Sequence, residues 1–299
     1  MVRKLTLPTI PEPFSSDFRA LLPALLATRG NLDAGRIERL RARRSILSQS
    51  GAFVGHRRYE RGDDLRHIDW SAYARTGELF TKQLEEDDRR AVTVIVDLSP
   101  SMLAGTPPRR LSALRLAAVI GCLALQRVDG VAVIAPGGSH PVARFSGPAQ
   151  LPALLTHLQQ LPTAPASASS AVALALQAEA FGRVHWISDF SPPQDFSLPL
   201  LSLRRRGAKV DGWVPTILED EVPPAGGYLR VVDPETEQEL EVPVDRDLHN
   251  ELCRQLTLLE RKQRRMFAEA GSPLRRWSMG DALQPRLADF LPIISGCTR

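Results

Sequence analysis

The chain has 299 residues, 43% of them hydrophobic and 24% charged, which is ordinary for a soluble globular protein with one large or two modest domains. Its three cysteines, Cys122, Cys253 and Cys297, lie far apart, so they exclude a disulfide framework and a Cys-x-x-Cys metal pair and indicate a reducing compartment. The formal net charge of +4 is spread over arginine patches, but no aromatic residues interleave with them, so we expect no nucleic-acid interface.

Residues 1–90 are predicted to form an N-terminal extension of helices and irregular segments. The first residues contain no apolar core of signal-peptide length. Polar capping residues and a Gly-Asn pair favour helices at 18–28 and 33–44. A polar stretch that we expect to be irregular continues to about Glu78, and the pattern at 79–84 predicts a strand.

Residues 91–299 alternate strand patterns with helical patterns, which is typical of an α/β fold with a doubly wound, mostly parallel sheet. Residues 217–245 break the alternation, and we expect a β-hairpin insertion there. The longest apolar stretch, 111–125, is interrupted by a serine and an arginine and is too short to cross a bilayer, so we expect a cytoplasmic protein without a membrane span. The predicted strands lie at 91–96, 130–135, 141–145, 184–189, 208–215 and 273–278, and the predicted helices at 109–127, 149–160, 170–181, 198–206, 247–270 and 281–291.

Polar side chains at every second position follow the strand predicted at 91–96. These are Asp97, Ser99 and Ser101. The carboxyl ends of strands are where ligands bind in open parallel sheets, and short oxygen donors suit Mg²⁺ or Mn²⁺. The same residues could instead cap the next helix, since aspartate and serine are favoured at helix N-termini.

A second apolar run also ends in a carboxylate, that of Asp189. Between the two runs, Ser167, Ser169 and Ser170 lie directly ahead of a helical pattern. A hydroxyl at that helix start could lie beside the same edge of the sheet. The sequence therefore predicts an oxygen-lined site formed by two strand ends and a loop.

This arrangement resembles the metal-ion-dependent adhesion site of proteins with a von Willebrand factor type A fold, which uses Asp-x-Ser-x-Ser, a distant Thr or Ser and a later strand-end Asp. In such sites the distant hydroxyl is usually a Thr followed by Asp. This chain has neither at that place, so a metal-free structural scaffold stays an alternative. The resemblance implies the metal ligands Asp97, Ser99, Ser101, one of Ser169 or Ser170, and Asp189.

A second block, from Arg57 to Thr76, contains Tyr-x-x-Gly-Asp-Asp-x-Arg-x-Ile-Asp-Trp in full. It closely resembles the signature of the domain of unknown function family 58, in which this block precedes an A-type domain. The resemblance implies an N-terminal region at 1–90 and a von Willebrand factor A-like domain at 91–299. The block comprises Tyr59, Gly62, Asp63, Asp64, Arg66, Asp69, Trp70 and Arg75.

Three carboxylates of this block, Asp63, Asp64 and Asp69, alternate with arginines. They could form a second metal site or supply catalytic carboxylates. We favour a structural interpretation, because bidentate Arg–carboxylate pairs fix an irregular backbone well. In that interpretation Ile68 and Trp70 anchor the block in the core.

We expect a non-enzymatic protein that binds Mg²⁺ or Mn²⁺ and uses it to hold an acidic residue of a partner protein. Hydroxyl ligands are neutral, so the cation stays electrophilic and its open position can accept a carboxylate. The family resemblance further implies a MoxR-type AAA+ ATPase as partner, in chaperone-like assembly. The alternative is a metal-dependent hydrolase or phosphotransferase that uses Asp97 and the Gly-Asp-Asp carboxylates, although the sequence shows no glycine-rich phosphate loop.

Overall fold

The chain forms two compact units. One comprises Met1–Leu26 and Arg90–Arg299, and the other Ala27–Arg89. The helices predicted at 33–44 and 281–291 lie outside the described residues. The computed structural model describes residues 12–22, 52–59, 68–85, 92–105, 107–125, 130–137, 140–165, 167–177, 182–192, 194–217, 225–232 and 238–278.

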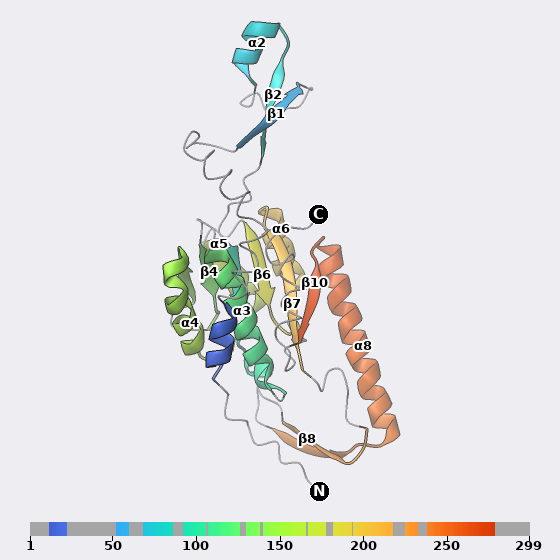
Figure 1. Cartoon of the computed structure of the whole chain (residues 1–299). Coiled ribbons are helices and arrows are strands. Elements are labelled where there is room, and N and C mark those ends of the chain that lie inside the picture. Colours follow the sequence, from blue (N-terminus) through green and yellow to red (C-terminus); the bar gives the residue numbers. More distant parts are fainter. Residues whose placement is uncertain are drawn as a thin grey trace. The chain divides into compact units, whose positions relative to one another are not determined.

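The larger unit is built on a six-stranded sheet with the order β10-β7-β6-β3-β4-β5 (Figure 1). All neighbouring strands are parallel except β4 and β5, which pair antiparallel. The sheet confirms the predicted α/β fold with a mostly parallel, doubly wound sheet. The strands are β3 (Val92–Val96), β4 (Val131–Ile134), β5 (Val142–Phe145), β6 (Arg183–Ile187), β7 (Lys209–Thr216) and β10 (Leu274–Ser278).

Helices cover both faces of this sheet. Val94 and Val96 of β3 belong to a core cluster shared with α3 and α4, whereas Ile95 belongs to a second cluster shared with α5, α6 and α8. Strands that are buried on both faces are apolar along their whole length, which is why the sequence predicted them. The helices are α3 (Arg109–Leu125), α4 (Leu151–Gln160), α5 (Ala168–Gln177), α6 (Ser197–Arg205) and α8 (Arg246–Glu269), with short 3₁₀ turns η2 (Pro100–Leu103) and η3 (Pro148–Gln150).

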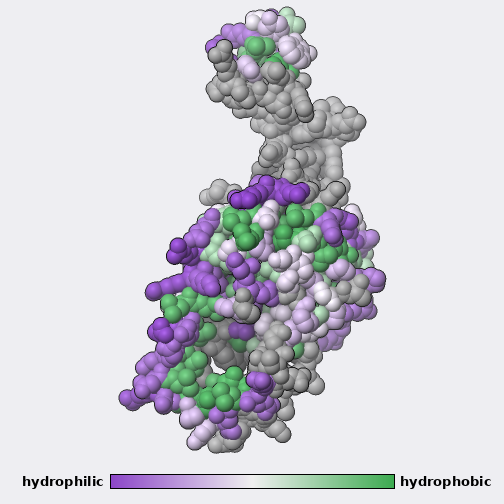
Figure 2. Space-filling model, turned by 180° about the vertical axis from the view of Figure 1, so that it is seen from behind, coloured by the Kyte–Doolittle hydropathy of each residue, from purple (hydrophilic) through white to green (hydrophobic). Residues whose placement is uncertain are grey.

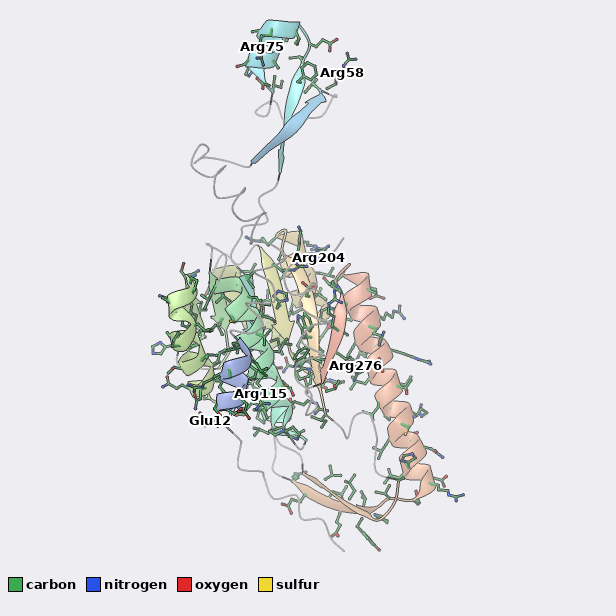
Figure 3. The ribbon with its side chains drawn as sticks, in the orientation of Figure 1. Glu12, Arg58, Arg75, Arg115, Arg204 and Arg276 are labelled. Carbon is green, nitrogen blue, oxygen red and sulfur yellow. The ribbon has the colours of Figure 1, made fainter. Side chains whose placement is uncertain are left out.

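A short helix at residues 16–22 packs in this unit. Phe14 and Phe18 stack with ring centroids 5.6 Å apart and are buried in the α3 cluster. Arg115 of α3 donates a hydrogen bond from Nε to the Pro13 carbonyl at 2.7 Å, and its guanidinium lies over the Phe18 ring (Figure 3). These contacts place the helix in the larger unit, whereas the prediction was an N-terminal extension over residues 1–90.

The smaller unit contains β1 (Ala52–Arg58), α2 (Trp70–Thr76) and β2 (Phe80–Glu85). β1 and β2 form their own antiparallel sheet, with a bulge between Phe53 and Gly55. The strand predicted at 79–84 is confirmed. The expectation of an irregular stretch up to Glu78 is wrong, because that stretch supplies both β1 and α2.

The predicted hairpin insertion is present as β8 (Tyr228–Val232) and β9 (Glu239–Pro243), which pair antiparallel. One face of the hairpin is aliphatic, and Leu240 on it is 62% exposed. Figure 2 shows apolar side chains at this end of the larger unit. None of the described helices is long and apolar enough to cross a membrane.

Candidate functional site

The strand-end residues meet where β3 and β6 leave the sheet. These strands are parallel neighbours whose last paired residues are Val96 and Ile187. The Asp97 N–H still donates to the Ile187 carbonyl at 2.9 Å, so the two chains run side by side past the strand ends. The connection from β3 to β4 passes over one face through α3, while β6 is followed by α6 on the other face. This is the type of edge at which open α/β sheets bind ligands.

The Asp97, Ser99 and Ser101 side chains form one linked group. The Asp97 carboxylate accepts a hydrogen bond at Oδ1 from the Ser99 N–H at 2.9 Å. Ser99 Oγ and Ser101 Oγ lie 3.0 Å apart. Neighbouring oxygen ligands of an octahedral Mg²⁺, with bonds of about 2.1 Å, also lie about 3.0 Å apart. The hydroxyl pair therefore fits two adjacent positions around such an ion.

The helix-capping interpretation accounts for only part of this group. Ser99 occupies the N-cap position of η2, yet the structure shows no hydrogen bond from its side chain to the described turn. The Asp97 carboxylate holds the Ser99 backbone instead. The Ser99 hydroxyl interacts with Ser101 and with the Asp97 carboxylate.

Burial makes Asp97 costly to ionise. Asp97 is 9% exposed, and burial raises the pKa of its carboxyl group above 3.8. Hydrogen bonds from Ser99 and Ser188 lower this pKa, while the charge of Asp189 raises it further. A divalent cation beside the two carboxylates would compensate both the lost hydration and the mutual repulsion.

Hydrogen bonds to both the carboxylate and the backbone carbonyl of Asp189 fix its position. Its Oδ1 accepts from the Ser191 N–H at 3.2 Å. Gln263 of α8 is buried and donates from Nε2 to the Asp189 carbonyl at 2.7 Å. Phe190 follows with φ of 48°, a left-handed backbone conformation that is unusual for a bulky residue. The chain therefore turns sharply away from the edge directly after Asp189.

The serines ahead of α5 have distinct roles. Ser170 donates a hydrogen bond from its N–H to Ser167 Oγ at 3.0 Å and from its hydroxyl to the Ser167 carbonyl at 2.8 Å. Ser167 therefore caps the helix, and the Ser170 hydroxyl is used within the cap. Ser167 and Ser169 are both exposed to solvent.

A cavity of about 10 Å³, room for about one water molecule, lies against Asp97. Its polar lining comes from Asp97, Ser167 and Gln194. Gln194 also accepts a hydrogen bond at Oε1 from the Ala168 N–H at 2.9 Å, which joins the loop after β6 to the start of α5. Ser167, and neither Ser169 nor Ser170, is thus the serine that shares this cavity with Asp97.

The loop before α5 is also tied to the site. The Ala164 N–H donates to the Leu98 carbonyl at 3.2 Å. Arg110 at the start of α3 donates to Thr163 Oγ1 at 3.0 Å and to the Leu161 carbonyl. The Thr163 hydroxyl is therefore engaged by Arg110, which braces the loop that carries Ser167.

The Gly-Asp-Asp block is only partly described, since Gly62, Asp63, Asp64 and Arg66 lie outside the described residues. Ile68 is buried as expected. The expected burial of Trp70 is wrong: this side chain is 63% exposed and packs edge-on against Tyr73, one turn along α2. Of the other block residues, Tyr59 donates its N–H to the Leu79 carbonyl, and Arg75 is exposed on α2.

Asp69 has a structural role as the N-cap of α2, where its Oδ1 accepts from the Ser71 and Ala72 N–H groups at 2.9 and 3.0 Å. Changing Asp69 to alanine is expected to destabilise the smaller unit by about 1 kcal/mol, because two helix N–H groups lose their acceptor. Changing Asp69 to serine should keep most of the stability. Thermal and urea unfolding of both variants would check this, and an unaffected alanine variant would contradict the capping role.

Sequence reasoning missed Ser188, Gln194 and Gln263. The Ser188 hydroxyl donates to Asp97 Oδ2 at 2.7 Å, across 91 positions of the chain. Ser188 directly precedes the strand-end Asp189, and this position in the sequence could have indicated that it lies at the site. The two glutamines lie in segments with no pattern that distinguishes them. In the described part of the chain, no three His, Cys, Asp or Glu side chains group closely enough to hold a metal.

Comparison with known proteins identifies relatives along most of the chain. The family model described as "Protein of unknown function DUF58" matches residues 55–263. Two curated relatives, "Uncharacterized protein Mb1516" of Mycobacterium bovis and "Uncharacterized protein Rv1480" of Mycobacterium tuberculosis, are each 27% identical over 239 residues, covering 77% of this chain and 75% of theirs.

Solved structures that resemble this chain include two from Bacteroides species. "Conserved hypothetical protein BatB" from Bacteroides thetaiotaomicron has a TM-score of 0.41 at 13% identity, covering 69% of this chain and 98% of its own. An "aerotolerance-related membrane protein" from Bacteroides fragilis has a TM-score of 0.39 at 16% identity, covering 66% and 95%.

Proposed function

The chain belongs to the DUF58 family, and we propose that this member is a non-enzymatic protein-interaction module that depends on Mg²⁺ or Mn²⁺. One observation carries the proposal: a buried carboxylate, Asp97, lies at a strand end beside the charge of Asp189 and next to the paired hydroxyls of Ser99 and Ser101. Buried carboxylates that repel each other favour a cation between them.

The proposed ligand set differs from the expected one at the third hydroxyl. Of the three serines, only Ser167 lines the cavity beside Asp97, and the Ser170 hydroxyl donates to the Ser167 carbonyl. We therefore assign the third hydroxyl to Ser167. A cation bound here would keep most of its positive charge, because most of its ligands would be neutral, and it could therefore accept a further negatively charged ligand. The residues of the chain bind and orient it.

The proposed partner is a protein that offers an acidic side chain to this edge. A carboxylate supplies the negative charge that the hydroxyl ligands lack. A MoxR-type AAA+ ATPase remains the proposed partner on the strength of the family resemblance. A cytoplasmic location likewise remains a proposal.

Metal binding tests the proposed function directly. Protein stripped with EDTA should bind Mn²⁺ or Mg²⁺ in isothermal titration calorimetry with one site per chain. The unfolding temperature should rise when the metal is added and fall back when EDTA removes it. A ligand that binds only the folded state stabilises that state. A stripped protein that neither binds nor responds to these ions would overturn the proposal in favour of a metal-free scaffold.

The assignment of Ser167 predicts a difference between neighbouring serines. Changing Ser167 to alanine is expected to weaken Mn²⁺ binding about tenfold. Changing Ser170 to alanine disturbs the same helix cap but leaves the Ser167 hydroxyl in place, so it serves as the matched control and should keep the affinity. Ser167→Thr should bind as the wild type does. Calorimetric titrations of the three variants would check this, and equal losses in Ser167→Ala and Ser170→Ala would argue for a helix-capping effect.

A further inference from the structure

The β8–β9 hairpin has a partly exposed aliphatic face. The strand pairing places Val231 opposite Leu240 and Leu229 opposite Val242. Because side chains alternate along a strand, these four lie on the same face of the hairpin. Leu240 and Val231 are 62% and 45% exposed. The hairpin lies at one end of the larger unit, ahead of α8 (Figure 1).

A hairpin of this kind lacks the support that strands need. An isolated two-stranded sheet is marginally stable in water, and independent stability requires a further strand or a packed helix. Within the described residues, β8 and β9 form a sheet of two strands, and no further strand pairs with either outer edge. The base of the hairpin is fixed, because the Val244 side chain is buried and its N–H donates to the Gly227 carbonyl at 2.8 Å. The outer edge of β9 can therefore accept an added strand.

The charge of the insertion determines which kind of strand fits this edge. Residues 217–245 contain nine acidic residues and one arginine, so their formal net charge is −8 in a chain that carries +4. Two of the acidic residues, Glu239 and Glu241, are exposed on β9, where they alternate with Leu240 and Val242. Such a surface repels nucleic acids and anionic lipids and attracts basic segments of proteins.

We propose that β9 accepts an extended segment of a partner protein in which aliphatic residues alternate with lysine or arginine. A strand added beside β9 has the same period of two, so its aliphatic side chains would cover the face that carries Leu240. Its cations would then lie on the opposite face, beside Glu239 and Glu241. Main-chain hydrogen bonds supply affinity, and the two faces supply specificity. None of the proposed metal ligands takes part, so this interaction is independent of the metal site.

A synthetic peptide tests the proposal directly. The probe is a short fluorescein-labelled peptide that alternates lysine with valine. Its fluorescence anisotropy should rise on titration with the full chain, and its affinity should fall as salt is added. Three control peptides should each bind more weakly. One carries glutamate in place of lysine, one has the same composition with its lysines and valines in two blocks, and one has N-methylated backbone amides that cannot pair with a strand.

Substitutions in β9 should weaken the binding of this peptide. Leu240→Ser removes an aliphatic contact and should raise the Kd about tenfold. Glu241→Lys reverses a charge beside the added strand and should raise the Kd about fivefold. Leu198→Ser on α6 and Glu269→Lys at the end of α8 are the matched controls, because both residues are exposed outside the hairpin. They should leave the Kd unchanged. Circular dichroism and thermal unfolding establish that each variant is folded.

The outcomes distinguish a partner from other occupants of the edge. An alternating peptide that binds no better than its glutamate counterpart, or that binds the β9 variants as tightly as the wild type, would overturn the proposal. Binding that occurs only after deletion of residues 2–11, which include Arg3 and Lys4 and no acidic residue, would assign the edge to the chain itself. A dimer in analytical ultracentrifugation that Leu240→Ser dissociates would assign it to a second copy. Either of these results would also overturn the proposed partner. Binding of the alternating peptide that weakens in both β9 variants and in neither control variant supports it.

Discussion

Changing Asp97 to alanine is expected to abolish the stabilisation of the protein by Mg²⁺. At a free Mg²⁺ concentration 100-fold above Kd, binding to the folded state contributes about 2.7 kcal/mol to the wild type. The alanine variant should gain nothing. It should also be less stable than the metal-free wild type by about 1–3 kcal/mol, because the buried Ser99 N–H and Ser188 hydroxyl lose their acceptor.

The wild type should show a pH dependence that the variant lacks. Burial raises the pKa of Asp97 above 3.8, so the folded state binds this proton more tightly than the unfolded state does. Asp97 therefore contributes stability to the metal-free protein below pH 3.8, and this contribution is lost as the pH rises through the raised pKa. Mg²⁺ requires the ionised carboxylate, so its stabilising effect should grow over the same interval.

Urea unfolding at several pH values, with Mg²⁺ and with EDTA, measures both effects. The difference between the two conditions should increase with pH in the wild type and stay near zero in Asp97→Ala. A variant that responds to Mg²⁺ as the wild type does would show that Asp97 takes no part in metal binding.

Changing Phe190 to alanine is expected to destabilise the larger unit by about 3–5 kcal/mol, the usual cost of removing a buried aromatic ring. The ring contacts Trp186, Phe196 and Phe267, which come from β6, the loop before α6, and α8. Its loss would leave a cavity where these elements meet.

A glycine variant separates packing from backbone strain. Phe190→Gly loses the same ring but adopts the left-handed conformation without strain, so it should be more stable than Phe190→Ala by about 0.5–1 kcal/mol. Leu198→Ala, at a side chain that is 71% exposed, should stay within about 0.5 kcal/mol of the wild type. Equilibrium unfolding by urea gives all three values. If glycine and alanine were equally stable, the conformation of Phe190 would carry no strain.

The main sheet could be predicted from sequence because its central strands are mostly apolar, with Thr93 in β3 and His185 in β6 as buried polar exceptions. β3 is buried along its whole length, and its end is marked by the change from valine to Asp97. β6 ends in the same manner before Asp189. Since parallel strands end at the same edge, the strand pattern predicts both carboxylates at that edge, and the structure adds that β3 and β6 are neighbours.

In the smaller unit, β1 and α2 were missed because their sequence patterns are weak. β1 ends in His-Arg-Arg and pairs with a single strand, so it lacks the apolar run of a central strand. α2 has seven residues and one buried side chain, Ala72. Its limits were nevertheless marked in the sequence by Asp69 at the N-cap and by Gly77, which ends it with φ of 71°.

The serine run ahead of α5 shows why the start of this helix was predicted two residues too late. The helix was expected to begin at Ser170 and begins at Ala168. Several serines in a row offer several possible caps, and the choice among them is made by contacts with other segments. Gln194, which holds the Ala168 N–H, comes from a loop 26 residues further on, and no local pattern indicates that contact.

The order of synthesis gives the N-terminal helix an unusual position in folding. Residues 16–22 leave the ribosome early, but Arg115, which anchors the Pro13 carbonyl, follows 102 residues after Pro13. At 5–20 residues per second this is a delay of roughly 5–20 seconds. All of Ala27–Arg89, the other compact unit, is made within that interval. Phe14 and Phe18 therefore dock only after α3 has formed, so this contact joins a segment made early to one made after the whole of the other unit.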